Sequence, residues 1–95
     1  MQGQGRSRVT TFYKSQDWRK ARLAHLQVHP FCIMCEENGK LIFANTVDHK
    51  IPINPVDPFD TQGGKYPHPL DPDNFQSMCA SCHNRKSAKE KPRNT

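Results

Sequence analysis

The chain has 95 residues, 34% of them hydrophobic, and a formal net charge of +5. A single domain of this size buries only about 60 to 68% of the surface exposed when it is unfolded, so its core needs further support, such as a structural metal. No apolar run reaches 18 residues, and the N-terminus lacks the apolar stretch of a signal peptide. We therefore expect no membrane association and a cytoplasmic (intracellular) protein.

The charge is distributed unevenly along the chain. Residues 1–22 carry six basic side chains and one acidic one, and residues 83–95 carry five basic and one acidic. Residues 23–82 carry three basic side chains and seven acidic ones. Basic ends around an acidic middle indicate a polyanion bound by the ends and cations bound by the middle. The alternative is that the terminal cations only keep the chain soluble.

The N-terminal part predicts an arm followed by a helix. Residues 1–11 are rich in Gly, Gln, Ser and Arg without periodicity, which indicates a flexible basic arm. A helix is predicted over residues 16–28, because Ser15 suits the N-cap, Asp17 the first turn and Pro30 the end. The apolar residues predicted to share one face of this helix are Trp18, Ala21, Ala24 and Val28.

The middle of the chain predicts a metal knuckle, a strand and a long loop. Cys32 and Cys35 lie in a short segment that ends in a predicted turn at Asn38-Gly39. Residues 41–53 are rich in apolar and β-branched residues, which favours a strand or hairpin arm. Residues 52–72 contain six of the eight prolines, so a long loop of functional or mobile character is predicted there.

The C-terminal part predicts a short strand, a second knuckle and a basic helix. The strand is expected over residues 74–78, and Cys79 and Cys82 form the second knuckle. The knuckle continues directly into a helix that ends before Pro92, which leaves a flexible tail over residues 92–95. The main domain is therefore expected to span residues 12–91.

The four cysteines are the strongest chemical signal in the sequence. Cys32 and Cys35 form one Cys-x-x-Cys pair, and Cys79 and Cys82 form a second. Two such pairs complete a closed tetrahedral zinc site with no open position, which predicts a structural role. The 43 residues between the pairs mean that the zinc would join the two ends of an inserted unit. Redox-active thiols or unligated cysteines are the alternatives.

Three further residues lie within or beside the cysteine pairs in a pattern that suits metal-assisted hydrolysis. His49 is the candidate general base, and Asp48 beside it is a candidate ligand of a divalent ion. His83 follows Cys82 directly, so a zinc site would fix its direction. Asp48 and His83 together would form an open site for Mg²⁺, Mn²⁺ or Ni²⁺. A surface Asp-His pair and an exposed His83 are the alternative interpretations.

The remaining candidates are one asparagine and six cations. Asn74 is either a turn residue or a bridge between backbone groups that holds His49 in place. The cations lie on the two predicted terminal helices, where they suit contacts to phosphates or, alternatively, form a solvated helix surface. These nucleic-acid-binding candidates are Arg19, Lys20, Arg22, Arg85, Lys86 and Lys89.

The runs PFCIMC, VDHKIPI and DPDNFQSMCASCHNRKSAKE together resemble the HNH endonuclease family, particularly small phage-type members with a four-cysteine zinc. The resemblance covers about residues 12–91. It implies an α+β fold with a zinc-stabilised ββα-metal (His-Me finger) core, preceded here by an added N-terminal helix. It matches His49 to the general base, Asp48 and His83 to the catalytic metal ligands, and Asn74 to the middle asparagine.

The resemblance implies a metal-dependent DNA endonuclease that leaves 5′-phosphate and 3′-hydroxyl ends, with a terminase-containing packaging complex as a possible partner. Two features depart from the family. Ser87 stands where some relatives have a second helix histidine, and the Pro-rich loop is longer than in minimal members. A non-catalytic zinc module that binds nucleic acid, and a thiol redox protein, are the competing hypotheses.

Overall fold

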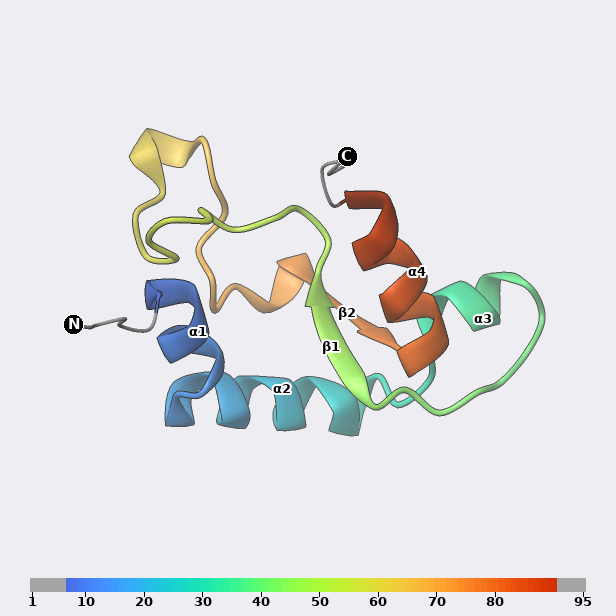
Figure 1. Cartoon of the computed structure of the whole chain (residues 1–95). Coiled ribbons are helices and arrows are strands. Elements are labelled where there is room, and N and C mark those ends of the chain that lie inside the picture. The colour runs from blue at the N-terminus through green and yellow to red at the C-terminus, as the bar shows by residue number, and fades with distance from the viewer. Residues whose placement is uncertain (1–6, 91–95) are drawn as a thin grey trace.

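The computed structural model describes residues 7–90 and shows a small α+β fold (Figure 1). Its elements are connected by turns and by one long loop, and none of the helices in residues 7–90 combines the length and apolarity that crossing a membrane requires. In chain order they are α1 (Arg8–Tyr13), α2 (Gln16–Val28), α3 (Ile33–Glu37), β1 (Thr46–His49), the 3-10 turns η1 (Gln62–Gly64) and η2 (Pro72–Asn74), β2 (Phe75–Met78) and α4 (Ala80–Glu90).

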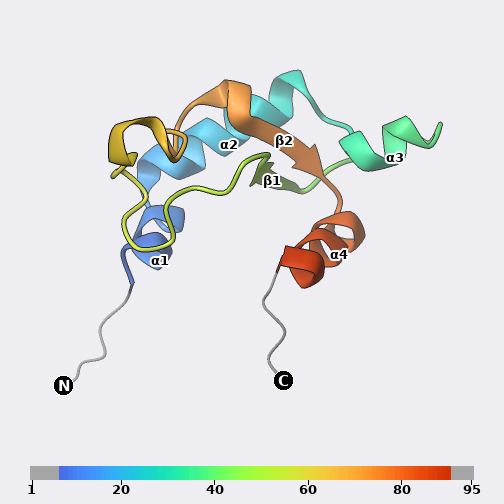
Figure 2. The ribbon, with the colours of Figure 1, turned by 90° about the horizontal axis from the view of Figure 1, so that it is seen from above.

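The two strands form an antiparallel sheet that lies between α2 and α4 (Figures 1 and 2). Asp48 pairs with Gln76, and His49 pairs with Phe75. Successive side chains of a strand point to opposite faces of the sheet. His49 and Phe75 accordingly contact Trp18 of α2, whereas Asp48 points toward α4.

The apolar core lies on the α2 side of the sheet, and a second buried cluster surrounds the cysteines. The second cluster contains Cys32, Met78 and Cys82. It joins the start of α3 to the end of β2 and the first turn of α4. The core proper consists of Phe12, Trp18, Val47, Ile53 and Phe75, with Ala21, Leu26 and Leu70 packed against it.

Helix α2 has the predicted bounds but a different buried face. Ser15 caps it as expected, since the Ser15 side chain accepts a hydrogen bond from the Trp18 amide. The prediction that Val28 shares the buried face was wrong, because its side chain is 71% exposed, and Ala24 is exposed as well. Leu26 packs on the core instead. The buried and half-buried residues of α2 lie at positions i, i+3, i+4, i+7 and i+8 from Trp18. Two of these positions carry polar residues, so the sequence did not show the buried face as a continuous apolar pattern.

Part of the predicted flexible arm over residues 1–11 is helical. Residues 1–6 lie outside the described residues, as does the predicted tail over residues 92–95, but residues 8–11 belong to α1. Ser7 caps this helix by accepting a hydrogen bond from the Thr10 amide. Phe12 anchors it in the core, and its carbonyl accepts a hydrogen bond of 2.6 Å from the Ser15 hydroxyl. Tertiary packing of Phe12 therefore orders a segment whose composition suggested disorder.

The predicted strand over residues 41–53 is also shorter, and the loop after it is organised. Regular pairing covers only Thr46–His49, while Phe43 meets Phe31 in an isolated bridge. In the loop, the Asn54 side chain is buried and donates to the Asp60 carbonyl at 2.9 Å. Phe59 packs edge-to-face on Phe12 of α1. The loop therefore lies against α1 as an ordered layer (Figure 1).

Candidate functional site

The four cysteine sulfurs lie close enough together to hold one metal ion. Cys32 caps α3, Cys35 lies within it, and Cys79 and Cys82 flank the first residues of α4. All four sulfurs lie within 4.8 Å of one another, and Cys35 Sγ lies 3.9 Å from Cys79 Sγ and 3.8 Å from Cys82 Sγ. A tetrahedron with metal–sulfur bonds of about 2.3 Å has edges of about 3.8 Å. The cluster therefore has the dimensions of a tetrahedral thiolate site.

Burial and hydrogen bonding among the four thiols shift the pKa values of Cys32 and Cys82 in opposite directions. Burial raises the pKa of Cys32, but hydrogen bonds from Cys35 and Cys79 outweigh it and bring the pKa to about 6. Hydrogen bonding with Cys79, together with burial, raises the pKa of Cys82 to about 12. Four neighbouring thiols cannot all ionise unless a positive charge neutralises them, which a bound metal does.

Asp48 and His83 form a second possible metal site on the α4 face of the sheet. Asp48 Oδ1 lies 3.8 Å from His83 Nε2, while Oδ2 lies 2.8 Å from Lys86 Nζ and accepts a hydrogen bond of 3.2 Å from Gln76. Two ligand atoms 3.8 Å apart can both lie about 2.1 Å from one ion. Both residues line a hollow of about 340 Å³. Because these two side chains supply only two ligand atoms, the other coordination positions of an ion held there would stay open.

His49 is buried and has a fixed tautomer. Its Nε2 lies 2.9 Å from the Pro69 carbonyl, and because a carbonyl only accepts, Nε2 carries the proton. Nδ1 is then an acceptor, and it receives a hydrogen bond of 3.1 Å from the Tyr13 hydroxyl. The ring stacks on Trp18 with centroids 5.2 Å apart. Burial lowers the pKa of His49, so the imidazole is held neutral with its basic lone pair on Nδ1.

Asp48 lines two hollows in the described part of the chain, each with a different predicted catalytic histidine. Asp48 and His83 line the hollow of about 340 Å³, and Asp48 and His49 line another of about 230 Å³. Asp48 and Tyr13 belong to both hollows, so these two residues join the histidine of β1 to the histidine of α4. The Tyr13 ring also packs edge-to-face on Trp18.

Asn74 bridges backbone groups across the ends of the strands. Its side chain is buried, its Oδ1 accepts from the Ile51 amide at 2.9 Å, and its Nδ2 donates to the Ile51 carbonyl at 2.9 Å. Its own carbonyl accepts from the Lys50 amide at 2.7 Å. These three bonds fix the two residues that follow His49, which matches the bridging alternative rather than a simple turn.

The predicted nucleic-acid contacts occupy different environments. Arg19, Lys20 and Arg85 are exposed on α2 and α4. Arg22 donates to the Asn45 carbonyl at 2.9 Å, and Lys86 forms the ion pair with Asp48. Lys89 belongs to α4, but its side chain lies outside the described part of the chain.

Four residues at the site were missed by the sequence analysis. Trp18 was assigned to packing alone, yet its ring stacks on His49. The position of Gln76 follows from the strand register, which pairs it with Asp48. Tyr13 and Pro69 carry no motif of their own, and only the folded loop and α1 bring them to His49.

Comparison with known proteins shows the family to which this arrangement of cysteines, aspartate, asparagine and histidines belongs. The pattern of the HNH endonuclease family matches residues 32–89, which include both cysteine pairs, Asp48, His49, Asn74 and His83. The chain belongs to the HNH endonuclease family. Its fold also matches the crystal structure of the HNH endonuclease of the deep-sea thermophilic bacteriophage GVE2 with manganese ion. That match has a TM-score of 0.66 and 37% sequence identity, and it covers 86% of this chain and 80% of the phage chain.

Membership of the HNH family supports a nuclease function, and the fold agrees with it. No curated protein is significantly similar in sequence to the chain. The GVE2 structure contains manganese, and the four clustered cysteines of the present chain can also hold a metal. The expected α+β fold and the likeness to a phage HNH enzyme are thereby confirmed.

Replacing Asn74 with alanine should destabilise the domain. The substitution removes the two part-buried hydrogen bonds to the amide and carbonyl of Ile51, each of which contributes about 0.5–1.5 kcal/mol. Denaturant unfolding measures this loss. Asn45→Ala is the matched control, because Asn45 is exposed and should change stability by less than about 0.5 kcal/mol. Equal stability of the two variants would contradict the bridging role.

Replacing Tyr13 with phenylalanine should raise the pKa of His49. The Tyr13 hydroxyl donates to Nδ1 only while His49 is neutral, so its loss removes an interaction that disfavours protonation. A hydrogen bond of about 0.5–1.5 kcal/mol corresponds to a rise of roughly half a unit to one unit. NMR titration of the His49 ring measures it, with the exposed His29 as internal reference. An unchanged or lower value would show that Nδ1 does not accept this bond.

Proposed function

We propose that the protein is a metal-dependent DNA endonuclease that hydrolyses phosphodiester bonds. The observation that carries the proposal is the joint placement of a neutral, tautomer-fixed His49 and the Asp48–His83 pair around Tyr13. A nuclease needs a base for water and a cation beside the phosphate, and these two groups have the corresponding chemistry. Membership of the HNH family supports the same assignment.

His49 acts as the general base in the proposed mechanism. The Tyr13 hydroxyl leaves Nδ1, and a water molecule takes its place within hydrogen-bonding distance. Nδ1 accepts a proton as the water oxygen attacks phosphorus, and the positive imidazolium is stabilised by its Nε2 bond to the Pro69 carbonyl. The bond from phosphorus to the 3′ oxygen breaks, and the departing oxygen takes a proton from a solvent water, which leaves a 5′-phosphate and a 3′-hydroxyl.

Asp48 and His83 are the proposed ligands of the catalytic ion. Magnesium, manganese or nickel bound there would stabilise the charge on the phosphate and on the departing 3′ oxygen. Lys86 and Gln76 hold the second oxygen of Asp48, so they orient the carboxylate with Oδ1 toward His83. Asn74 positions the chain that follows His49 by bridging Ile51.

Zinc is the proposed occupant of the four-cysteine cluster, where its role is structural. The sulfur spacing suits metal–thiolate bonds of about 2.3 Å, and the four ligands leave no position for a substrate. The cluster joins α3 to α4 and thereby fixes His83, which follows Cys82 in the chain.

DNA is the proposed substrate and the main partner. The cations on α2 and α4 suit contacts to its phosphates; they are Arg19, Lys20, Arg22, Arg85, Lys86 and Lys89. By family likeness we further propose that a terminase-containing packaging complex is a protein partner and that the protein acts in the cytoplasm.

Replacing His49 with glutamine should abolish cleavage while the fold is kept. A glutamine amide can still donate to the Pro69 carbonyl, but it cannot accept a proton from water. Loss of a general base typically lowers the rate about 10²–10⁴-fold. Nicking of supercoiled plasmid, tested in several divalent ions, measures the rate. His29→Gln, at an exposed histidine, should cut like the wild type.

Cleavage by His49→Gln at the wild-type rate would disprove the role of His49. Binding of plasmid by the wild-type protein without scission in any ion would instead favour the non-catalytic zinc module.

Replacing Cys82 with serine should remove the structural metal and unfold the domain. Metal binding at such sites contributes apparent free energies of about 10–16 kcal/mol to folding. The expected results are loss of one equivalent of zinc by elemental analysis and loss of the cooperative thermal transition by circular dichroism. Asp48→Asn should retain the zinc, because Asp48 belongs to the other site. A fully folded, zinc-free Cys82→Ser protein would contradict the structural assignment.

A further inference from the structure

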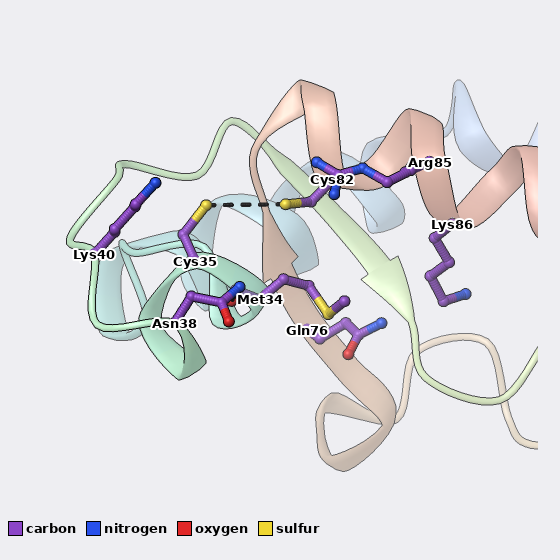
Figure 3. Close-up of a pocket in the computed structure, with 8 residues that line it drawn as sticks. All are labelled: Met34, Cys35, Asn38, Lys40, Gln76, Cys82, Arg85 and Lys86. Carbon is purple, nitrogen blue, oxygen red and sulfur yellow. Dashed lines mark hydrogen bonds between the residues drawn. The ribbon is translucent and has the colours of Figure 1, made fainter.

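A pocket of about 640 Å³ lies beside the cysteine cluster and is lined in part by Gln76 and Lys86 (Figure 3). It is larger than either hollow at the catalytic centre and falls within the range of about 300–1,000 Å³ that is typical of ligand sites. We call it the knuckle pocket. Its lining residues come from α3 and the turn after it, from β2 and from α4; they are Met34, Cys35, Asn38, Lys40, Gln76, Cys82, Arg85 and Lys86.

The rim of the knuckle pocket is positively charged. Lys40 and Arg85 extend on the two sides of the Cys35–Cys82 pair (Figure 3), and both side chains are exposed. Lys86 adds a third cation, although its charge is already shared with Asp48. Among the described residues that line the pocket, none is acidic. This lining attracts an anion, and Lys40 and Arg85 are the two cations placed to bind it.

The knuckle pocket is connected to the catalytic centre through two side chains. Gln76 and Lys86 line the pocket, and both also contact Asp48 Oδ2, at 3.2 and 2.8 Å. Lys86 additionally lines the hollow that contains His49. A polymeric anion bound to the ion that Asp48 and His83 would hold can therefore continue past Gln76 into the knuckle pocket. A DNA strand is such a polymer, with a phosphate about every 3.4 Å of helix axis.

We propose that the knuckle pocket binds the sugar–phosphate backbone of the substrate strand next to the cleaved phosphodiester. The inference rests on the proposed nuclease function and adds a subsite to it. A phosphate lies between Lys40 and Arg85, and the adjoining deoxyribose contacts the Met34 side chain, which is 43% exposed. Contacts of this kind fix the register of the strand and do not depend on base sequence.

The cysteine cluster also positions the two cations of the knuckle pocket. Lys40 stands just after the turn at Asn38 and Gly39, and its amide donates to the Cys35 carbonyl at 2.9 Å. Gly39 adopts a φ of +79°, which a side chain would strain, so the turn has one preferred shape. The cysteine cluster therefore positions Lys40 through α3 and positions Arg85 through α4.

The experiment measures DNA binding separately from cleavage. His49→Gln protein is used as the parent, and Lys40→Ala and Arg85→Ala are added to it one at a time. Affinity for a short duplex is measured by fluorescence anisotropy over a range of salt concentrations. Lys65→Ala is the matched control, because Lys65 lies over the Tyr66 ring outside the pocket. In each protein, neutral methylphosphonates replace single phosphates around the cut in turn.

Each pocket variant should lose one phosphate contact. The slope of log K against log salt should then become shallower by about 0.9, and affinity at 0.1 M salt should fall about eightfold, as that slope implies. A methylphosphonate at one position beside the cut should weaken the parent and Lys65→Ala proteins. The same methylphosphonate should have a smaller effect on Lys40→Ala and on Arg85→Ala than on the parent, because each variant already lacks one of the two contacts to that phosphate.

The proposal would be overturned if Lys40→Ala and Arg85→Ala both kept the salt slope and the DNA affinity of the parent protein. It would also be overturned by a methylphosphonate effect that stays fully additive with Lys40→Ala at every position. Failure of the wild-type protein to cleave DNA would count against the proposed function alone, because binding to the pocket is measured in a protein that lacks the base.

Discussion

The contact among the four cysteine sulfurs is the constraint on which the rest of the site depends. The domain is too small for a large core, and its principal apolar cluster lies on the α2 face of the sheet. On the other face, α4 is held at its start by Cys79 and Cys82. His83 and Lys86 of the same helix contact Asp48. Helix α4 thus links the cysteine cluster to the Asp48–His83 pair.

The environment of His49 is built from parts of the chain that lie far apart in sequence. Pro69 of the long loop fixes its protonated nitrogen, Tyr13 of α1 covers its basic nitrogen, and Trp18 of α2 stacks on its ring. Tyr13 and Trp18 precede residues 32–89, the segment that matches the family. The family segment therefore contains Asp48, His49 and His83, and the N-terminal helices complete the surroundings of His49.

The sequence predicted features that depend on local signals. A capping serine and a following proline placed α2, and the spacing of the cysteines anticipated a cluster that the structure brings together. Features set by tertiary contacts escaped prediction. Helix α1 forms because Phe12 is buried, and the loop is ordered by the buried side chain of Asn54. Neither contact leaves a periodic pattern, and the same holds for the Pro69 carbonyl, which any residue could supply.

The alternation of side chains along β1 places two residues that are adjacent in sequence on opposite faces of the sheet. Asp48 points to the α4 face and His49 to the α2 face, although they are neighbours. A single inserted or deleted residue within this strand would interchange their sides, placing a carboxylate against Trp18 and an imidazole against Lys86. A change of chain length in the loop beyond the strand, whose ends Asn74 ties together, leaves both directions unaltered.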